Sequence, residues 1–376
     1  MSGRLRWGIL GAGWIATKFA RDLSYGVTGR VSRVASRDFV AAQALARACA
    51  AQASESFEAM LRADDVDAVY IATPAAFHHL HVIQALSRGK PVLCEKPFAL
   101  NAEEAREIVE AARRARCFCM EGMWTRFLPT MNELRGKLKR NELGDISQMS
   151  VDLGFVHNEE SSNATLTDPA LGGGALLDLG IYGVSLAHDL LGMPREIQAE
   201  AVISPTGSVR DVSITFLHEK MKRPALCSIR ASHSTELRNA LDISGSRGRI
   251  SVDAPFIRAI QARMSPLGPR GRTAERPSAL GDALRGSRLW PVARGLARRA
   301  TGREGVAFGR PFVGYGLRFE AEEVARCLAA GQLESPVMPL SESVEVLESV
   351  DRISALISDR GMQDGLELGR VPTVAE

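Results

Sequence analysis

The chain has 376 residues, which is long for a single core and predicts two domains. Hydrophobic residues make up 45% of it and charged residues 24%, as in ordinary soluble globular proteins, and no uninterrupted apolar run is long enough to span a bilayer. The six cysteines are scattered, without the second cysteine or histidine pair that a metal site needs. Since the N-terminus also shows no signal-peptide pattern, we expect a reduced, cytoplasmic protein without a metal site.

The net charge of +3 is unevenly placed along the chain. Between Arg263 and Arg310, eleven arginines stand against three acidic residues, so this stretch carries +8 and the remainder −5. The basicity belongs to one segment, which argues against binding of nucleic acid by the whole protein. We expect residues 263–311 to form an inserted, Arg-rich surface loop with one helix around residues 290–300, or else an anion-docking arm.

The first third of the chain alternates short apolar strands with helices. The expected strands span residues 5–10, 31–35, 66–72, 91–94 and 117–120, and the helices between them span 14–23, 39–50, 77–87 and 101–116. The last of these helices begins with the capping-box spacing of Asn101 and Glu104. Strands that are apolar on both faces need cover on both sides, so we predict a doubly wound parallel sheet of the Rossmann type over residues 1–124.

The pattern changes in the rest of the chain. After a helix at 126–140, the expected strands span residues 146–155, 196–203, 209–216, 225–232 and 237–243, with one helix at 176–191 among them. Two closing helices span 319–328 and 341–357. Consecutive strands without helices between them predict an α+β second domain over residues 125–376, with a large, mostly antiparallel open sheet.

A glycine turn follows the first strand. Gly11 permits a tight turn, Gly13 lets the backbone approach a pyrophosphate, and Ala16 allows close packing of the next helix, which Trp14 and Ile15 begin. The helix N-terminus favours an anion. The turn therefore predicts a dinucleotide cofactor, and the alternative is an ordinary strand-to-helix connection.

The end of the second strand bears on the choice of cofactor. An NAD site usually has an acidic residue there, whereas this chain has Ser36 and Arg37 followed by Asp38. A guanidinium suits the 2′-phosphate of NADP. We expect NADP, with NAD as the alternative if Asp38 turns inward.

Lys96 ends another apolar strand, within Glu95-Lys96-Pro97. Ligands of open α/β sheets bind beyond the carboxyl ends of the strands, so we expect Lys96 at the reactive end of the cofactor. Thr73, Pro74 and His78 follow the third strand and are expected on the cofactor rim. Spacing alone does not choose among His78, His79 and His81.

Asp178 and Tyr182 follow a run of three glycines, residues 172–174. They are four residues apart, so on a helix they share one face. Beside Lys96 they would form an acid/base set, in which the ammonium lowers the pKa of the tyrosine. The alternative is a tyrosine that merely packs in the core.

Together these motifs resemble the glucose–fructose oxidoreductase / inositol dehydrogenase / rhizopine-catabolism (Gfo/Idh/MocA) family, in the branch of dimeric dihydrodiol dehydrogenase and NADP-dependent D-xylose dehydrogenase. The resemblance rests on residues 11–16, 72–74 with His78, 89–97, 121–127, 171–182 and 334–339. It implies that Lys96 and Tyr182 form the catalytic pair and that Asp178 holds the nicotinamide end and the substrate. It further implies that Glu95, Trp124 and Arg126 line the cofactor site, that Arg37 selects NADP, and that the second sheet forms a dimer interface.

The sequence thus predicts an NADP-dependent oxidoreductase that moves a hydride between the nicotinamide and a CH–OH or C=O group of a sugar, cyclic polyol or trans-diol. Its expected partners are that small molecule and a second copy of the chain, in a homodimer or higher homo-oligomer. Two other functions stay open: a glycosidase that uses tightly bound NAD for transient oxidation, and a cofactor-binding regulator without turnover.

Overall fold

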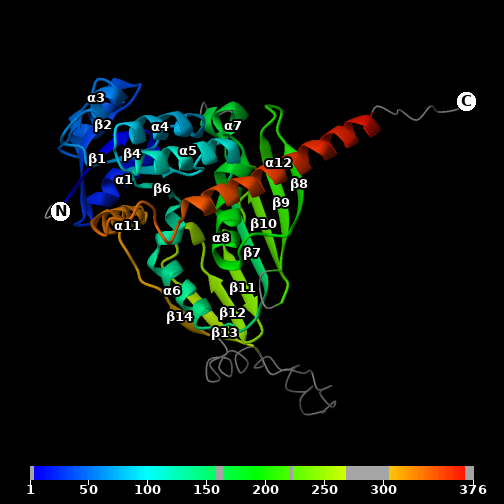
Figure 1. Cartoon of the computed structure of the whole chain (residues 1–376). Helices are drawn as coiled ribbons and strands as arrows, with labels where there is room; N and C mark the ends of the chain where they lie inside the picture. Colours follow the sequence, from blue (N-terminus) through cyan, green and yellow to red (C-terminus); the bar gives the residue numbers. More distant parts are fainter. Residues whose placement is uncertain (1–3, 158–163, 220–222, 268–304, 369–376) are drawn as a thin grey trace, which may run out of the picture.

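The computed structural model describes residues 4–157, 164–219, 223–267 and 305–368. Within this part the chain forms two sheets, one in each half, joined by helices that contact both (Figure 1). The parallel sheet has the order β3-β2-β1-β4-β5-β6, and the second has the order β14-β13-β12-β11-β7-β10-β9-β8. The predicted fold class, a Rossmann sheet followed by an α+β unit with a large sheet, is confirmed.

All neighbouring strands of the first sheet run parallel. They are β1 (Leu5–Leu10), β2 (Gly29–Ala35), β3 (Gln52–Ala53), β4 (Ala68–Ile71), β5 (Val92–Glu95) and β6 (Cys119–Gly122). The helices are α1 (Trp14–Ser24), α2 (Phe39–Ala48), α3 (Phe57–Leu61), α4 (His78–Ser87) and α5 (Ala102–Ala115). Every residue of β4 and β5 is buried, as expected for strands covered on both faces. The strand order reverses at the junction of β1 and β4, and ligands of open α/β sheets bind beyond the carboxyl ends of the strands at such a junction.

The predicted start of α5 is borne out in its details. The Asn101 side chain accepts a hydrogen bond from the Glu104 N–H at 2.9 Å, and the Glu104 carboxylate accepts one from the Leu100 N–H at 3.0 Å. The first bond satisfies an N–H group that the first helical turn cannot pair internally, and the second ties the residue before the N-cap to the helix.

The second sheet is mixed. Its described strands pair antiparallel except for β7 and β10, which run parallel. The strands are β7 (Ile146–Gly154), β8 (Glu196–Ile203), β9 (Val209–His218), β10 (Ala225–Ser232), β11 (Leu241–Gly245), β12 (Gly248–Val252), β13 (Ala262–Pro266) and β14 (Val306–Phe308). The remaining helical elements include α6 (Pro129–Lys139), α7 (Ala164–Thr167), α8 (Ile181–Leu191), α11 (Arg318–Ala329) and α12 (Leu340–Leu368).

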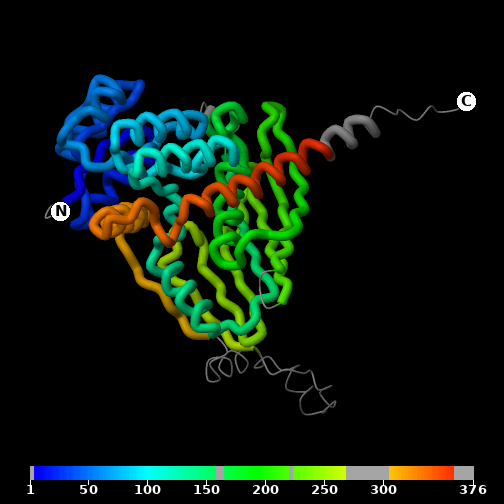
Figure 2. The backbone as a smooth tube through the Cα atoms, viewed as in Figure 1, coloured from blue at the N-terminus to red at the C-terminus, as the bar shows by residue number. Residues whose placement is uncertain are grey.

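Contacts of α12 and α11 help to join the halves. Helix α12, orange to red in Figures 1 and 2, contacts α5 of the first half and α8 and β8 of the second. The buried Asp22 carboxylate of α1 accepts hydrogen bonds at 2.7–3.0 Å from the backbone N–H groups of Tyr315, Gly316 and Leu317, which lead into α11. A carboxylate that satisfies three amide donors fixes the approach of α11 to the parallel sheet.

Several element boundaries differ from the predictions for local reasons. The helix expected from residue 126 begins at Pro129, because a separate 3-10 turn, η2 (Trp124–Phe127), precedes it and proline occupies its first position. The strand expected from residue 237 begins at Leu241, and α12 runs beyond residue 357. The short elements β3, α3, β12, β13 and β14 were not predicted, because so few residues carry little periodic signal.

The predicted insertion is shorter than residues 263–311. Its two ends are strands, because β13 and β14 pair antiparallel with Met264 opposite Val306. The helix expected around residues 290–300 lies outside the described residues.

One helical stretch, Pro169–Leu191, is long and apolar enough to cross a membrane by length and composition alone. Within it, 72% of the most apolar window is buried inside the fold. A core helix of a soluble protein passes the same test, and this stretch contains Asp178 and Tyr182.

Candidate active site

Lys96 lies directly after β5 and is held by Asp178. Its Nζ donates hydrogen bonds to the backbone carbonyl of Asp178 at 2.7 Å and to Oδ1 of the same residue at 2.9 Å. Burial alone would lower the pKa of Lys96, but Asp178, Tyr182 and Glu95 together outweigh burial and raise it. Burial would likewise raise the pKa of Asp178, but Lys96 and His233 hold it well below its usual range. Both groups are therefore charged at neutral pH.

Tyr182 lies beside this ion pair. The Lys96 Nζ is 4.8 Å from the centroid of the Tyr182 ring, and the Trp124 Nε1–H donates a hydrogen bond to the Tyr182 Oη at 2.8 Å. Because Trp124 uses the hydroxyl as an acceptor, the proton of Tyr182 is free to point at another group. Burial raises the pKa of Tyr182 to about 12, although Lys96 acts to lower it. Lys96 thus lowers this pKa as expected, but the expected net lowering is wrong, because desolvation of the phenolate is the larger effect.

The backbone before Tyr182 differs from the expected α-helix. One turn of π-helix, η4 (Leu176–Gly180), precedes α8. The Asp178 N–H donates to the Gly174 carbonyl at 3.0 Å. Gly174 has φ +114°, which only glycine adopts readily, so the glycine run sets the entry of this turn. Turns of π-helix occur frequently at functional sites.

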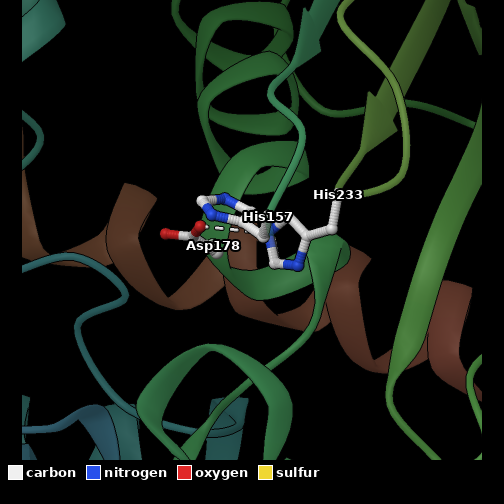
Figure 3. Close-up of side chains that lie close together, drawn as sticks. All are labelled: His157, Asp178 and His233. Carbon is white, nitrogen blue, oxygen red and sulfur yellow. Dashed lines mark hydrogen bonds and ion pairs between the residues drawn. The ribbon is translucent and has the colours of Figure 1, made fainter. Parts of the chain in front are cut away.

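Two histidines that sequence reasoning missed lie beside Asp178. The His233 Nε2 is 3.1 Å from the Asp178 Oδ2, and the ring centroids of His157 and His233 are 4.5 Å apart (Figure 3). His157 follows β7 and His233 follows β10. Because these two strands run parallel, their carboxyl ends meet at one edge of the sheet. That strand-end position is the signal that could have found them, had the parallel pairing been known.

The glycine turn fits the diphosphate of a dinucleotide. Gly11 has φ +104°, and a Cβ there would lie 2.5 Å from the Ala72 carbonyl oxygen, so no other residue fits this tight turn. A Cβ on Gly13 would meet no atom of the described residues within 4 Å. Among the residues that the structure describes, no side chain caps α1, and its first turn contains no acidic residue. Uncapped N–H groups facing open space suit an anion. Trp14 is exposed beside this space and Ile15 is half-buried.

The end of β2 presents Ser36 and Arg37. Arg37 is exposed, with its guanidinium carbon 5.4 Å from the centroid of the Phe77 ring. The Asp38 Oδ1 accepts a hydrogen bond from the Ala41 N–H at 3.0 Å and thereby caps α2. The aspartate that could have served a ribose is therefore engaged by a helix N-terminus.

The loop after β4 carries Thr73, Pro74 and His78. His78 is buried, with Nδ1 2.7 Å from the Pro97 carbonyl oxygen and Nε2 2.8 Å from that of Thr73. It thus braces this loop against the segment that carries Lys96. Thr73 and Pro74 are half-buried, and the Thr73 hydroxyl is 3.0 Å from the His81 Nδ1.

Two expected cofactor ligands turn into the core. Glu95 is buried and accepts a hydrogen bond from the Tyr70 hydroxyl. Arg126 is fully buried, and its guanidinium contacts the Ser185 hydroxyl and carbonyl, the Val337 carbonyl and the Glu342 carboxylate. Since all three of its nitrogens are engaged, Arg126 joins η2 to α8 and α12. Both side chains are therefore engaged by other residues of the fold.

Comparison with known proteins identifies the family. Residues 5–123 match the oxidoreductase family with an NAD-binding Rossmann fold, and residues 131–251 match the GFO/IDH/MocA C-terminal domain. The chain is 29% identical to the D-xylose 1-dehydrogenase (NADP(+)) of Hypocrea jecorina over 92% of its length and 90% of that protein's. It is 34% identical to the trans-1,2-dihydrobenzene-1,2-diol dehydrogenase of Mus musculus, over 92% and 95% of the two lengths.

Solved structures show the same fold. The aldose–aldose oxidoreductase of Caulobacter crescentus superimposes with a TM-score of 0.76 at 19% identity, covering 95% of this chain and 98% of that one. A 3-ketoreductase of Actinomadura kijaniata in complex with NADP gives 0.75 at 20% identity, covering 94% and 98%. Since family-specific domains match both halves and curated relatives match nearly the whole length, the chain is an oxidoreductase of the Gfo/Idh/MocA family with a Rossmann domain for a nicotinamide dinucleotide.

Proposed function

We propose that the protein is an NADP-dependent dehydrogenase or reductase acting on a CH–OH or C=O group of a sugar, cyclic polyol or trans-diol. The observation that supports this best is the contact of the half-buried Lys96 and Asp178 with the buried Tyr182, beyond the carboxyl end of β5. This contact places the positive charge of Lys96 beside the phenol of Tyr182. No described residue accepts a hydrogen bond from that phenol.

When bound, the dinucleotide supplies or accepts a hydride at its nicotinamide ring. In the reductive direction the carbonyl carbon gains the hydride and its oxygen gains the proton of Tyr182, so that C=O becomes CH–OH. Oxidation reverses both transfers. Because its pKa is raised, Lys96 remains an ammonium, and its role in the proposal is to stabilise negative charge on the reacting oxygen and on Tyr182. Asp178 holds that ammonium in place.

Lys96→Met tests this mechanism. We expect turnover to fall by about 10²–10⁴-fold while the fold is retained, because a positioned charge that stabilises the transition state is lost. Reduction of NADP by the purified protein would be measured over a panel of sugars, polyols and diols. The exposed Lys139→Met is the matched control. A Lys96→Met variant with wild-type turnover would contradict the assignment.

We further propose that Arg37 selects NADP by pairing with its 2′-phosphate. A charge-assisted hydrogen bond contributes about 1.5–3 kcal/mol, so Arg37→Ala should weaken NADP by roughly 10–100-fold and NAD far less. Titration of each cofactor measures the two affinities, with Arg47→Ala at the far end of α2 as the control. Equal losses for NADP and NAD would mean that Arg37 has no part in the choice.

The curated relatives support a sugar or diol as the substrate class, since their names give D-xylose and a trans-diol. The alternative of a glycosidase with tightly bound NAD predicts hydrolysis without net reduction of added cofactor. The alternative of a regulator predicts cofactor binding without turnover. The panel assay separates all three.

We also propose a homodimer or higher homo-oligomer in a reducing compartment such as the cytoplasm. Val202 and Leu226 are 48% and 40% exposed and lie on the same outward face of the second sheet, so apolar side chains are available there to a second copy. The six cysteines are all free, as expected in a reducing compartment. Sedimentation of the purified protein measures the assembly.

A further inference from the structure

Three polar side chains converge beside the proposed catalytic pair. His157, Asp178 and His233 each offer a ligand atom, and these atoms all lie within 4.8 Å of one another. Figure 3 shows the two imidazoles next to the Asp178 carboxylate, which the dashed line joins to His233. The His157 Nε2 is buried and has no hydrogen-bond partner among the described residues.

The unpaired Nε2 is held in place by the backbone. The His157 N–H donates to the His233 carbonyl at 2.9 Å, and the His233 N–H donates to the Arg210 carbonyl at 2.9 Å. The two residues therefore stay anchored at the strand ends. A buried polar atom without a partner destabilises the fold, and a ligand that supplies the partner recovers that cost.

The surroundings disfavour a metal ion as that ligand. A carboxylate only accepts hydrogen bonds, so the His233 Nε2 must carry its proton to bond with Asp178 and has no lone pair for a metal. The Lys96 ammonium, 2.9 Å from the other Asp178 oxygen, also repels a cation. A hydroxyl group fits better, since it both donates and accepts and carries no charge. Burial and the neighbouring His233 lower the pKa of His157, so its imidazole is neutral at neutral pH.

The Asp178 carboxylate links this cluster to the reacting position. Its Oδ1 faces Lys96 and its Oδ2 faces His233, so one side of the group belongs to the Lys96–Tyr182 pair and the other to the histidines. Because both sides belong to one carboxylate, a hydroxyl bound by the histidines would lie next to the reacting position, as the second hydroxyl of a vicinal diol does.

We propose that His157, together with His233 and Asp178, binds a second substrate hydroxyl, on the carbon next to the one that reacts, so that the site selects vicinal diols. This inference rests on the proposed function and adds the substrate feature that the site reads. It also accounts for the two substrates that the relatives' names give, each of which has hydroxyls on neighbouring carbons.

The experiment compares substrates with and without the second hydroxyl. kcat/KM would be measured with NADP for trans-cyclohexane-1,2-diol against cyclohexanol, and for D-xylose against 2-deoxy-D-xylose. In the wild type we expect the missing hydroxyl to lower kcat/KM by about 10–100-fold, because one buried hydrogen bond is lost. In His157→Leu that penalty should shrink to within about threefold, because only the diol loses a partner.

Two further variants keep the result interpretable. His157→Gln retains a hydrogen-bonding side chain and should recover part of the penalty, whereas a merely structural role predicts no such rescue. His79→Leu is the control, since His79 pairs with Glu107 on the surface and lies outside the site. An unchanged penalty in His157→Leu, with equal losses on both members of each pair, would overturn the inference.

Metal content supplies an independent outcome. If the purified wild type holds one zinc ion per chain and EDTA abolishes its activity, the three residues are metal ligands and the inference fails. Failure of the proposed function looks different, because then no compound in the panel reduces NADP. In that case, titration of trans-cyclohexane-1,2-diol and cyclohexanol into the NADP-loaded wild type and His157→Leu would still measure the hydroxyl preference.

Discussion

At the scale of single residues, two opposing effects, burial and the nearby positive charge of Lys96, determine the pKa of Tyr182. The Lys96 ammonium favours the phenolate, but removal of the hydroxyl from water disfavours it more, and the pKa rises to about 12. The neutral phenol is therefore the dominant form at neutral pH. In the proposed mechanism the phenol gives a proton to a carbonyl oxygen, whereas oxidation of an alcohol needs the phenolate and should quicken as the pH rises.

Tyr182→Phe tests this assignment, because it removes only the hydroxyl. We expect turnover to fall by about 10²–10⁴-fold, the usual contribution of a positioned proton donor or acceptor. The increase of the oxidative rate with pH that Tyr182 sets should also disappear. Turnover of both directions would be measured from pH 6 to 10. An active variant with an unchanged pH profile would mean that Tyr182 is a core aromatic whose hydroxyl is incidental.

At the scale of elements, the Arg-rich insertion is a connection between two paired strands. β13 and β14 run antiparallel, with Ala262 opposite Phe308 and Met264 opposite Val306. The segment between them therefore leaves and re-enters the sheet at neighbouring points, so a short turn can replace it without moving either strand.

Deleting residues 268–304 and closing the gap with a short glycine-containing turn should leave a folded, active enzyme. Because each halving of loop length saves roughly 0.6 kcal/mol of closure entropy, the free energy of unfolding should not fall and could gain up to about 2 kcal/mol. Denaturant unfolding and kcat/KM measure both effects. Removing residues 262–308, strands included, is the contrasting variant and should destabilise the sheet. Loss of folding in the shorter deletion would show that the segment belongs to the core.

At the scale of the whole molecule, buried carboxyls make stability depend on pH. Glu121 is almost fully buried, and burial raises its pKa from 4.5 to about 7. Between these values the folded state binds more protons than the unfolded state, so stability falls as the pH rises. The contribution of Glu121 to the free energy of unfolding is complete below pH 4.5 and is lost as the pH rises past 7.

Glu121→Gln removes the ionisation while keeping the shape and the oxygen that accepts the Phe98 N–H. We expect little change in stability at pH 5 and a gain at pH 8 of up to about 3 kcal/mol, since each pKa unit corresponds to roughly 1.4 kcal/mol. Urea unfolding at the two pH values measures the difference, with the exposed Glu110→Gln as control. A destabilised variant at pH 8 would contradict this account.

Local patterns in the sequence were enough to predict the Rossmann half and the cofactor turn. The alternation of apolar strands with helices predicts the parallel sheet, and the spacing of Gly11 and Gly13 predicts the turn that the structure contains. The cap formed by Asn101 and Glu104 was equally readable. These features depend on residues close in sequence, whose backbone preferences and hydrogen bonds act over a few positions.

Only the tertiary structure decided the rest of the site. His157 and His233 meet because β7 and β10 pair in parallel across a long stretch of chain, and no local pattern encodes that pairing. Contacts from α8 and α12 turn Arg126 into the core. Its nearness in sequence to Trp124 therefore did not reveal that it joins η2 to these two helices. The raised pKa of Tyr182 likewise follows from burial by distant segments. Strand pairing and desolvation are properties of the assembled chain, and residues far apart in sequence determine them together.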